Sequence, residues 1–317
     1  MKKRLSALIT VAIVAFFVVL ALASIGDDSD SSNNGPTNDG TTQSPSSNSG
    51  SNDITVSPSP EAPQIDVPEG GIILFDESDM IVTVTGIERT RDGYVKNIQF
   101  LIENNGSDER AIETLNNNFI TKVVRINNFS IQAGISATVA SGKAARETMS
   151  IDNKDAELFN IKDIFEISMQ FETYTPDNFN RVNNIVHELS TISIASNNFS
   201  SFNNGTLAFS NDYVEIYSCD FSSGLLSSSM VIVVKNISNN DAHFRLENIS
   251  VNGIMNSSSI GNGGNIFNET YRIFRIMLDD DVDTRDINEI EFKLELGDFN
   301  DIVSFNTKDI GIVTITY

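Results

Sequence analysis

The chain has 317 residues, with 43 Asp and Glu against 21 Lys and Arg, so its formal net charge is −22. A surplus of carboxylates this large argues against nucleic acid as a partner, because phosphate binding depends on clustered cations. The single cysteine, Cys219, excludes an intramolecular disulfide.

Residues 1–25 form a candidate export or membrane segment. Lys2, Lys3 and Arg4 precede an uncharged, mainly apolar run at residues 5–25. About 20 apolar residues can cross a hydrocarbon core of ~30 Å, and the preceding cations keep the N-terminus in the cytoplasm. We predict a retained transmembrane helix, in a single-pass protein of the cell membrane with its C-terminal part extracellular. The alternative is a signal peptide, cleaved near the small-x-small sequence at residues 21–23, which would give a secreted product.

Residues 26–68 have the composition of a linker. They are rich in Ser, Asn, Asp, Gly, Thr and Pro, and no Lys or Arg occurs between Arg4 and Arg89. A segment with so few large apolar side chains cannot bury enough surface to offset its conformational entropy. We therefore predict a disordered, acidic spacer that holds the rest of the chain away from the membrane.

From residue 69 onward the pattern predicts β-strands. Apolar and polar residues alternate in segments such as 80–85, 292–296 and 312–317, and Asn, Gly, Asp and Ser separate the segments. Alternation with period two is typical of half-buried antiparallel strands. The best helix candidate, residues 109–121, contains three consecutive asparagines and is a poor one. In the segment 271–278, we expect Phe274, Ile276 and Leu278 to point into the core.

The same order of features occurs twice, which predicts an internal repeat. We therefore expect an all-β fold with two tandem immunoglobulin-like β-sandwich domains, at residues 69–196 and 197–317. A closed barrel is the alternative architecture. The matched segments are 71–75 with 205–209, 103–108 with 235–241, 128–131 with 248–251, 141–148 with 263–270, 161–164 with 287–290, and 192–194 with 313–315.

These turn and strand motifs, among them Asn128-Phe129-Ser130-Ile131 and Ser141-Gly142-Lys143, resemble the small immunoglobulin-like domains of Gram-positive bacterial envelope proteins. The resemblance covers residues 70–317 in two copies. Proteins of this family commonly carry an N-terminal anchor and a low-complexity spacer, so the resemblance implies an envelope location. It implies no catalytic residues.

Asp279, Asp281 and Asp283 are the candidate metal ligands, because closely spaced carboxylates suit Ca²⁺. Their loop departs from an EF-hand, with Thr284 in place of the glycine at position 6 and Ile290 in place of the glutamate at position 12. An acidic, solvated loop between strands is the alternative interpretation. Cys219 is interpreted as a half-buried strand residue.

The sequence lacks the nucleophile and phosphate-loop motifs of common enzymes, so we predict no enzymatic activity and no cofactor. Paired carboxylates for glycoside chemistry stay open, because their spacing in space cannot be read from sequence. We predict an extracellular envelope protein that presents two β-sandwich domains to an envelope protein or a cell-wall partner. The alternative is an exported receptor for a small molecule or calcium.

Overall fold

The computed structural model describes residues 66–115, 122–177, 180–195, 202–223, 228–257, 263–280, 282–299 and 307–317. The predicted anchor and nearly all of the predicted linker, up to residue 65, lie outside the described residues. In the described ranges, no helix has the length and apolar character needed to cross a membrane. Residues 60–317 form one compact unit.

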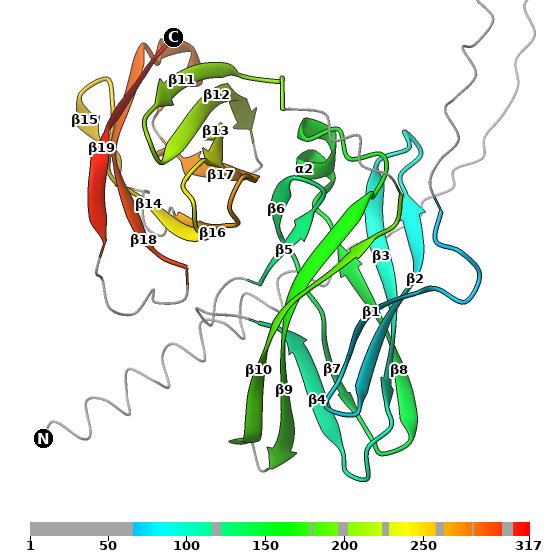
Figure 1. Cartoon of the computed structure of the whole chain (residues 1–317). Coiled ribbons are helices and arrows are strands. Elements are labelled where there is room, and N and C mark those ends of the chain that lie inside the picture. Colours follow the sequence, from blue (N-terminus) through cyan, green and yellow to red (C-terminus); the bar gives the residue numbers. More distant parts are fainter. Residues whose placement is uncertain are drawn as a thin grey trace, which may run out of the picture. The chain divides into compact units, whose positions relative to one another are not determined.

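Strands dominate this unit, which confirms the all-β fold class (Figure 1). The N-terminal half, residues 66–195, contains β1 (Ile72–Glu77), β2 (Met80–Arg89), β3 (Val95–Asn104), β4 (Arg110–Thr114), β5 (Val123–Ile126), β6 (Phe129–Gln132), β7 (Ser136–Val139), β8 (Lys143–Ser150), the short helix α2 (Asn153–Leu158), β9 (Glu166–Asp177) and β10 (Asn180–Ser193). The C-terminal half, residues 202–317, contains β11 (Thr206–Ser210), β12 (Val214–Ser223), β13 (Ser228–Asn236), β14 (Ala242–Val251), β15 (Ile254–Met255), β16 (Gly263–Ile266), β17 (Tyr271–Met277), the 3₁₀ turn η1 (Thr284–Asp286), β18 (Glu289–Asp298) and β19 (Lys308–Thr316).

Each half buries the apolar face of its alternating strands between two layers. In the N-terminal half, the sheet β1-β2-β3-β8 packs against β4, β5, β7 and β9 around one hydrophobic cluster. In the C-terminal half, β11-β12-β13-β17 pack against β14, β18 and β19 around a second cluster. Phe274, Ile276 and Leu278 are at most 5% exposed, as predicted from their spacing. The weak helix candidate at 109–121 contains strand β4 instead.

Matching strand irregularities and matching hydrogen bonds support the repeat in its first two pairs of segments. A register shift falls between Ile73 and Phe75 where β1 pairs with β2, and between Leu207 and Phe209 where β11 pairs with β12. Two fully buried asparagines then close equivalent turns. The Asn104 amide donates to the carbonyls of Asp108 and Val139, and the Asn236 amide donates to those of Asn240 and Ile266.

The pairing of 128–131 with 248–251 was wrong. Segment 129–131 lies after a hairpin turn, in β6, whereas 248–251 lies before one, in β14. The equivalent turn residues are Asn127 and Asn252, with left-handed φ angles of 56° and 50°. The side-chain Oδ1 of each accepts two backbone N–H groups and Nδ2 donates to a backbone carbonyl; the partners are Phe165, Glu166 and Asp163 for Asn127, and Asn288, Glu289 and Asp286 for Asn252.

The pairing of Ser141-Gly142-Lys143 with the glycines at 263–264 was also wrong. Gly142 corresponds to Glu269, since both have positive φ and both donate their N–H to the carbonyl of the buried turn asparagine. Glu269 therefore occupies a left-handed position where glycine is the usual residue. Matching glycine with glycine in the sequence placed Gly142 opposite the wrong residues.

Candidate binding groove

The two halves are joined by hydrogen bonds that the sequence did not predict. Strand β17 meets β6 in a parallel bridge between Tyr271 and Phe129, which continues one sheet across both halves. The buried hydroxyls of Ser130 and Thr270 lie 2.6 Å apart, and the N–H of Phe267 donates to Ser130 Oγ over 3.0 Å. These bonds position the loop that contains Phe267 against the N-terminal half.

An aromatic cluster fills this junction. Phe129 stacks on Phe159 with ring centroids 4.1 Å apart, and Phe202 contacts the rings of Phe159, Tyr217 and Tyr271 at 5.5–5.9 Å. Because Phe202 and Tyr271 belong to the hydrophobic cluster of the N-terminal half, the C-terminal half contributes directly to its neighbour's core.

Helix α2 adds a charged contact to the junction. Asp152 caps the helix by accepting from the N–H groups of Lys154 and Asp155. The carboxylate of Asp155 then pairs with Arg275 on β17. Burial raises the pKa of Asp155 above its ordinary value, against the opposing effect of the Arg275 hydrogen bond.

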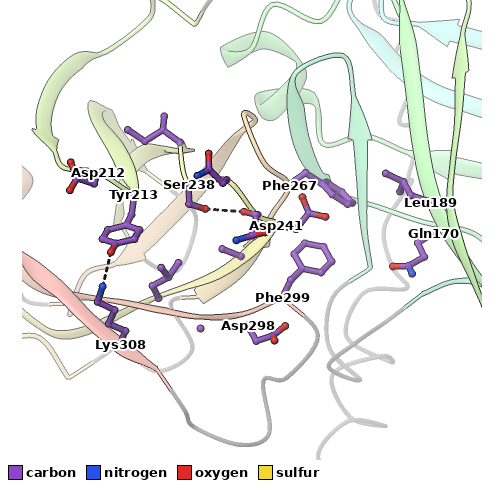
Figure 2. Close-up of a pocket in the computed structure, with 16 residues that line it drawn as sticks. Gln170, Leu189, Asp212, Tyr213, Ser238, Asp241, Phe267, Asp298, Phe299 and Lys308 are labelled. Carbon is purple, nitrogen blue, oxygen red and sulfur yellow. Dashed lines mark hydrogen bonds between the residues drawn. The ribbon is translucent and has the colours of Figure 1, made fainter.

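Next to the junction lies a groove of about 800 Å³. Figure 2 shows Gln170 and Leu189 on one side of it, with Tyr213, Phe267 and Phe299 among the residues that face them. The first two residues lie on β9 and β10, and the others come from turns at the end of the C-terminal sandwich. The lining is completed by Asp212, Ile237, Ser238, Asn239, Asn240, Asp241, Ala242, Leu296, Gly297, Asp298 and Lys308.

Exposed carboxylates dominate the charge of the groove. Asp212, Asp241 and Asp298 line it, and Lys308 is its single cationic side chain among the described residues. Lys308 Nζ donates to the Tyr213 hydroxyl over 2.6 Å and lies 4.4 Å from the centre of that ring. The groove therefore carries two negative charges in excess, and its one cation already has a partner.

The apolar part of the groove is firmly held. Phe267 and Phe299 are 3% and 8% exposed, with ring centroids 5.1 Å apart, and they form a small hydrophobic cluster with Val123 of the N-terminal half. Leu189 is 39% exposed. The groove thus offers an ordered apolar floor beneath a rim of carboxylates and amides.

The predicted metal ligands lie elsewhere, at the turn around η1. Asp281 lies outside the described residues. Asp279 accepts from the N–H and hydroxyl of Ser257, and Asp283 accepts from the Arg285 guanidinium at 2.9 Å. Within the described ranges, no group of three His, Cys, Asp or Glu side chains could hold a metal ion. The calcium site at Asp279, Asp281 and Asp283 therefore stays a prediction.

The cysteine and the histidines lie in separate settings. Cys219 is half-buried on β12, and burial with the neighbouring Asp220 raises its pKa to about 11, as expected of an unreactive strand thiol. His187 bridges Glu77 and Thr173, whereas His243 contacts Asn265 in the other half.

One pair of carboxylates was beyond sequence reasoning. Glu113 and Glu172 lie directly opposite each other on β4 and β9 and are 8% and 6% exposed. Arg181 on β10 contacts both, at 2.9 Å from Glu172 Oε2, and Lys122 lies 3.7 Å from Glu113. The cations hold the pair as an ion cluster, and each carboxylate has a cationic partner within the sheet.

No family model and no curated protein matches the chain. A transglutaminase of red sea bream matches among solved structures, with 8% identity and a TM-score of 0.21. The match covers 76% of this chain and 31% of that protein, so the chain spans about a third of its length. A likeness this low informs neither fold nor activity.

Proposed function

We propose that this is a non-enzymatic protein of the cell envelope that presents two immunoglobulin-like β-sandwich modules, at 69–196 and 197–317, to a protein or cell-wall partner. The groove at the junction carries this proposal as the contact surface. Part of its rim is formed by turns at the end of a sandwich, and binding residues are most often found on such loops. The N-terminal cations and apolar run, followed by an acidic linker, support an external location.

The groove is also suited to binding a partner because both halves line it and hydrogen bonds at the junction join the two halves. Phe267 reaches the groove from a loop that is hydrogen-bonded to Ser130 of the other half. A preformed surface binds without the entropic cost of first ordering its walls.

An exported receptor for a small molecule or calcium is the second candidate. The groove volume of about 800 Å³ favours the small-molecule version, since it falls within the usual range for ligand pockets. The calcium version depends on Asp281, which lies outside the described residues.

Two measurements on intact cells test the proposal. Protease added outside the cells should cleave the folded part, and the remaining N-terminal piece should stay with the membrane fraction. A photo-crosslinking residue at Leu189 should give discrete adducts, while the same residue at Ile312, exposed and outside the groove lining, should give none. Protection from the protease would refute the external location, and equal adducts from both sites would refute the groove as the contact surface.

A further inference from the structure

We propose that the groove binds an extended peptide segment in which lysine or arginine alternates with aliphatic residues. This inference rests on the proposed function and specifies its ligand. The observation behind it is the combination of an acidic rim, at Asp212, Asp241 and Asp298, with an apolar floor at Phe267 and Phe299.

The negative charge of the groove favours a ligand with positive charge. Its one cation among the described residues, Lys308, is held by the hydroxyl and ring of Tyr213. An anionic ligand would meet three carboxylates, whereas a cationic one would gain attraction at the rim. The whole chain, at −22, also raises the local concentration of cations near its surface.

The shape and chemistry of the groove favour a peptide over a bare ion. A space of about 800 Å³ is far larger than a cation, and its carboxylates come from two separate turns and from the end of strand β18. Lysine and arginine side chains lay an aliphatic stem on apolar surface while the charged end stays at a polar rim. Leu189 and Leu296 supply such surface next to the carboxylates.

Amide groups on the rim suit the backbone of an extended segment. Asn239 and Asn240 are exposed, and Gln170 lies on the opposite wall with its amide donating to the His187 carbonyl over 3.0 Å. Asparagine side chains can both donate to and accept from a peptide group. A peptide lying between these walls could therefore bond to both halves of the chain at once.

The test uses the purified full-length protein and fluorescence anisotropy. The probe is a fluorescein-labelled hexapeptide of alternating lysine and leucine, compared with glutamate–leucine and glutamine–leucine versions. We expect the lysine peptide to bind most tightly. Its affinity should fall between 50 and 500 mM salt, because salt screens the attraction between partly exposed charges. Tighter binding of the glutamate peptide, or equal binding of all three, would overturn the proposal.

Charge variants separate the groove from non-specific attraction. Asp241→Asn and Asp298→Asn should each weaken binding about two- to five-fold, and Lys308→Gln should strengthen it by a similar factor. Asp76→Asn makes the same charge change at an exposed site on β1, outside the groove lining, and should have no effect. Equal weakening by all three aspartate variants would show non-specific attraction and refute the site.

A neutral tetrasaccharide of N-acetylglucosamine serves as the competing ligand. Displacement of the lysine peptide by this sugar, at a lower concentration than by unlabelled peptide, would assign the groove to saccharides and overturn the peptide proposal. The proposed contact function would survive that result, because crosslinks from Leu189 report contact whatever the ligand. Loss of those crosslinks while the peptide still bound would instead count against the proposed function alone.

Discussion

Substitutions of the buried turn asparagines test whether the stability of each half depends on the other half. In Asn236→Ala, the carbonyls of Asn240 and Ile266 lose their donors and the N–H of Ser238 loses its acceptor. The bond to Ile266 is buried, and unpaired buried polar groups cost about 1–3 kcal/mol. We expect the free energy of unfolding to fall by about 2–3 kcal/mol, which lowers Tm by about 5–10 °C for a unit of this size.

Asn104→Ala makes the matching change in the N-terminal half, where the carbonyls of Asp108 and Val139 lose their donor. Because Phe202 and Tyr271 complete the core of that half, unfolding either half would break the shared junction. We therefore expect both variants to shift one common transition.

Urea unfolding followed by circular dichroism and by tyrosine fluorescence measures these shifts, and Asn239→Ala, at an exposed position of the same turn as Asn236, is the control. Two transitions, each moved by only one of the variants, would refute the coupling of the halves. Shifts no larger than the control's would refute the energetic role assigned to the buried amides. The two variants are expected to add in the double mutant, since they share no partner.

Three further predictions concern single sites. The Cys219 thiol, whose pKa is raised to about 11 by burial and a neighbouring carboxylate, should stay protonated at pH 8 and react with Ellman's reagent far more slowly in the native protein than in urea; equal rates would contradict this. Arg181→Ala should lower the free energy of unfolding by roughly 1–2 kcal/mol at pH 7, discounted for its partial exposure, because it leaves the opposed Glu113 and Glu172 without their shared cation; urea unfolding measures this loss, and a variant as stable as the parent protein would contradict it. Calorimetric titration with Ca²⁺ should show no binding with a Kd below about 1 mM, because the Asp283 carboxylate already accepts from the Arg285 guanidinium. A heat of binding that gives a lower Kd and disappears in Asp283→Asn would establish the calcium site.

Strand positions and the inward faces could be predicted because they depend on local alternation. Phe274 and Ile276 point to the core for the same reason that every second residue of a strand does. The repeat was visible for a similar reason where it involved strands, as in 71–75 and 205–209. It was misaligned at the turns, because short Asn- and Ser-containing segments recur by chance in a chain with this composition.

The junction and the groove could not be predicted, since both depend on pairs far apart in sequence. Ser130 and Thr270 are polar residues in strand-like segments, and nothing local indicates that their hydroxyls meet. Glu113 and Glu172 likewise look like ordinary solvent-facing positions, although the fold places them opposite each other. Only the register of the sheets brings such residues together.

The duplicated asparagines show what the repeat requires physically. Asn104 and Asn236 each connect a turn to the carbonyl of a distant strand, so each replaces backbone bonds that the chain cannot make at that corner. Asn127 and Asn252 do the same at a second corner, in a left-handed conformation that asparagine tolerates better than most residues. A related chain could therefore exchange most of its strand residues for other apolar ones and still keep the three buried asparagines, Asn104, Asn127 and Asn236. Other apolar side chains can fill the volume of a core, whereas nothing replaces an amide donor that is missing at a buried corner.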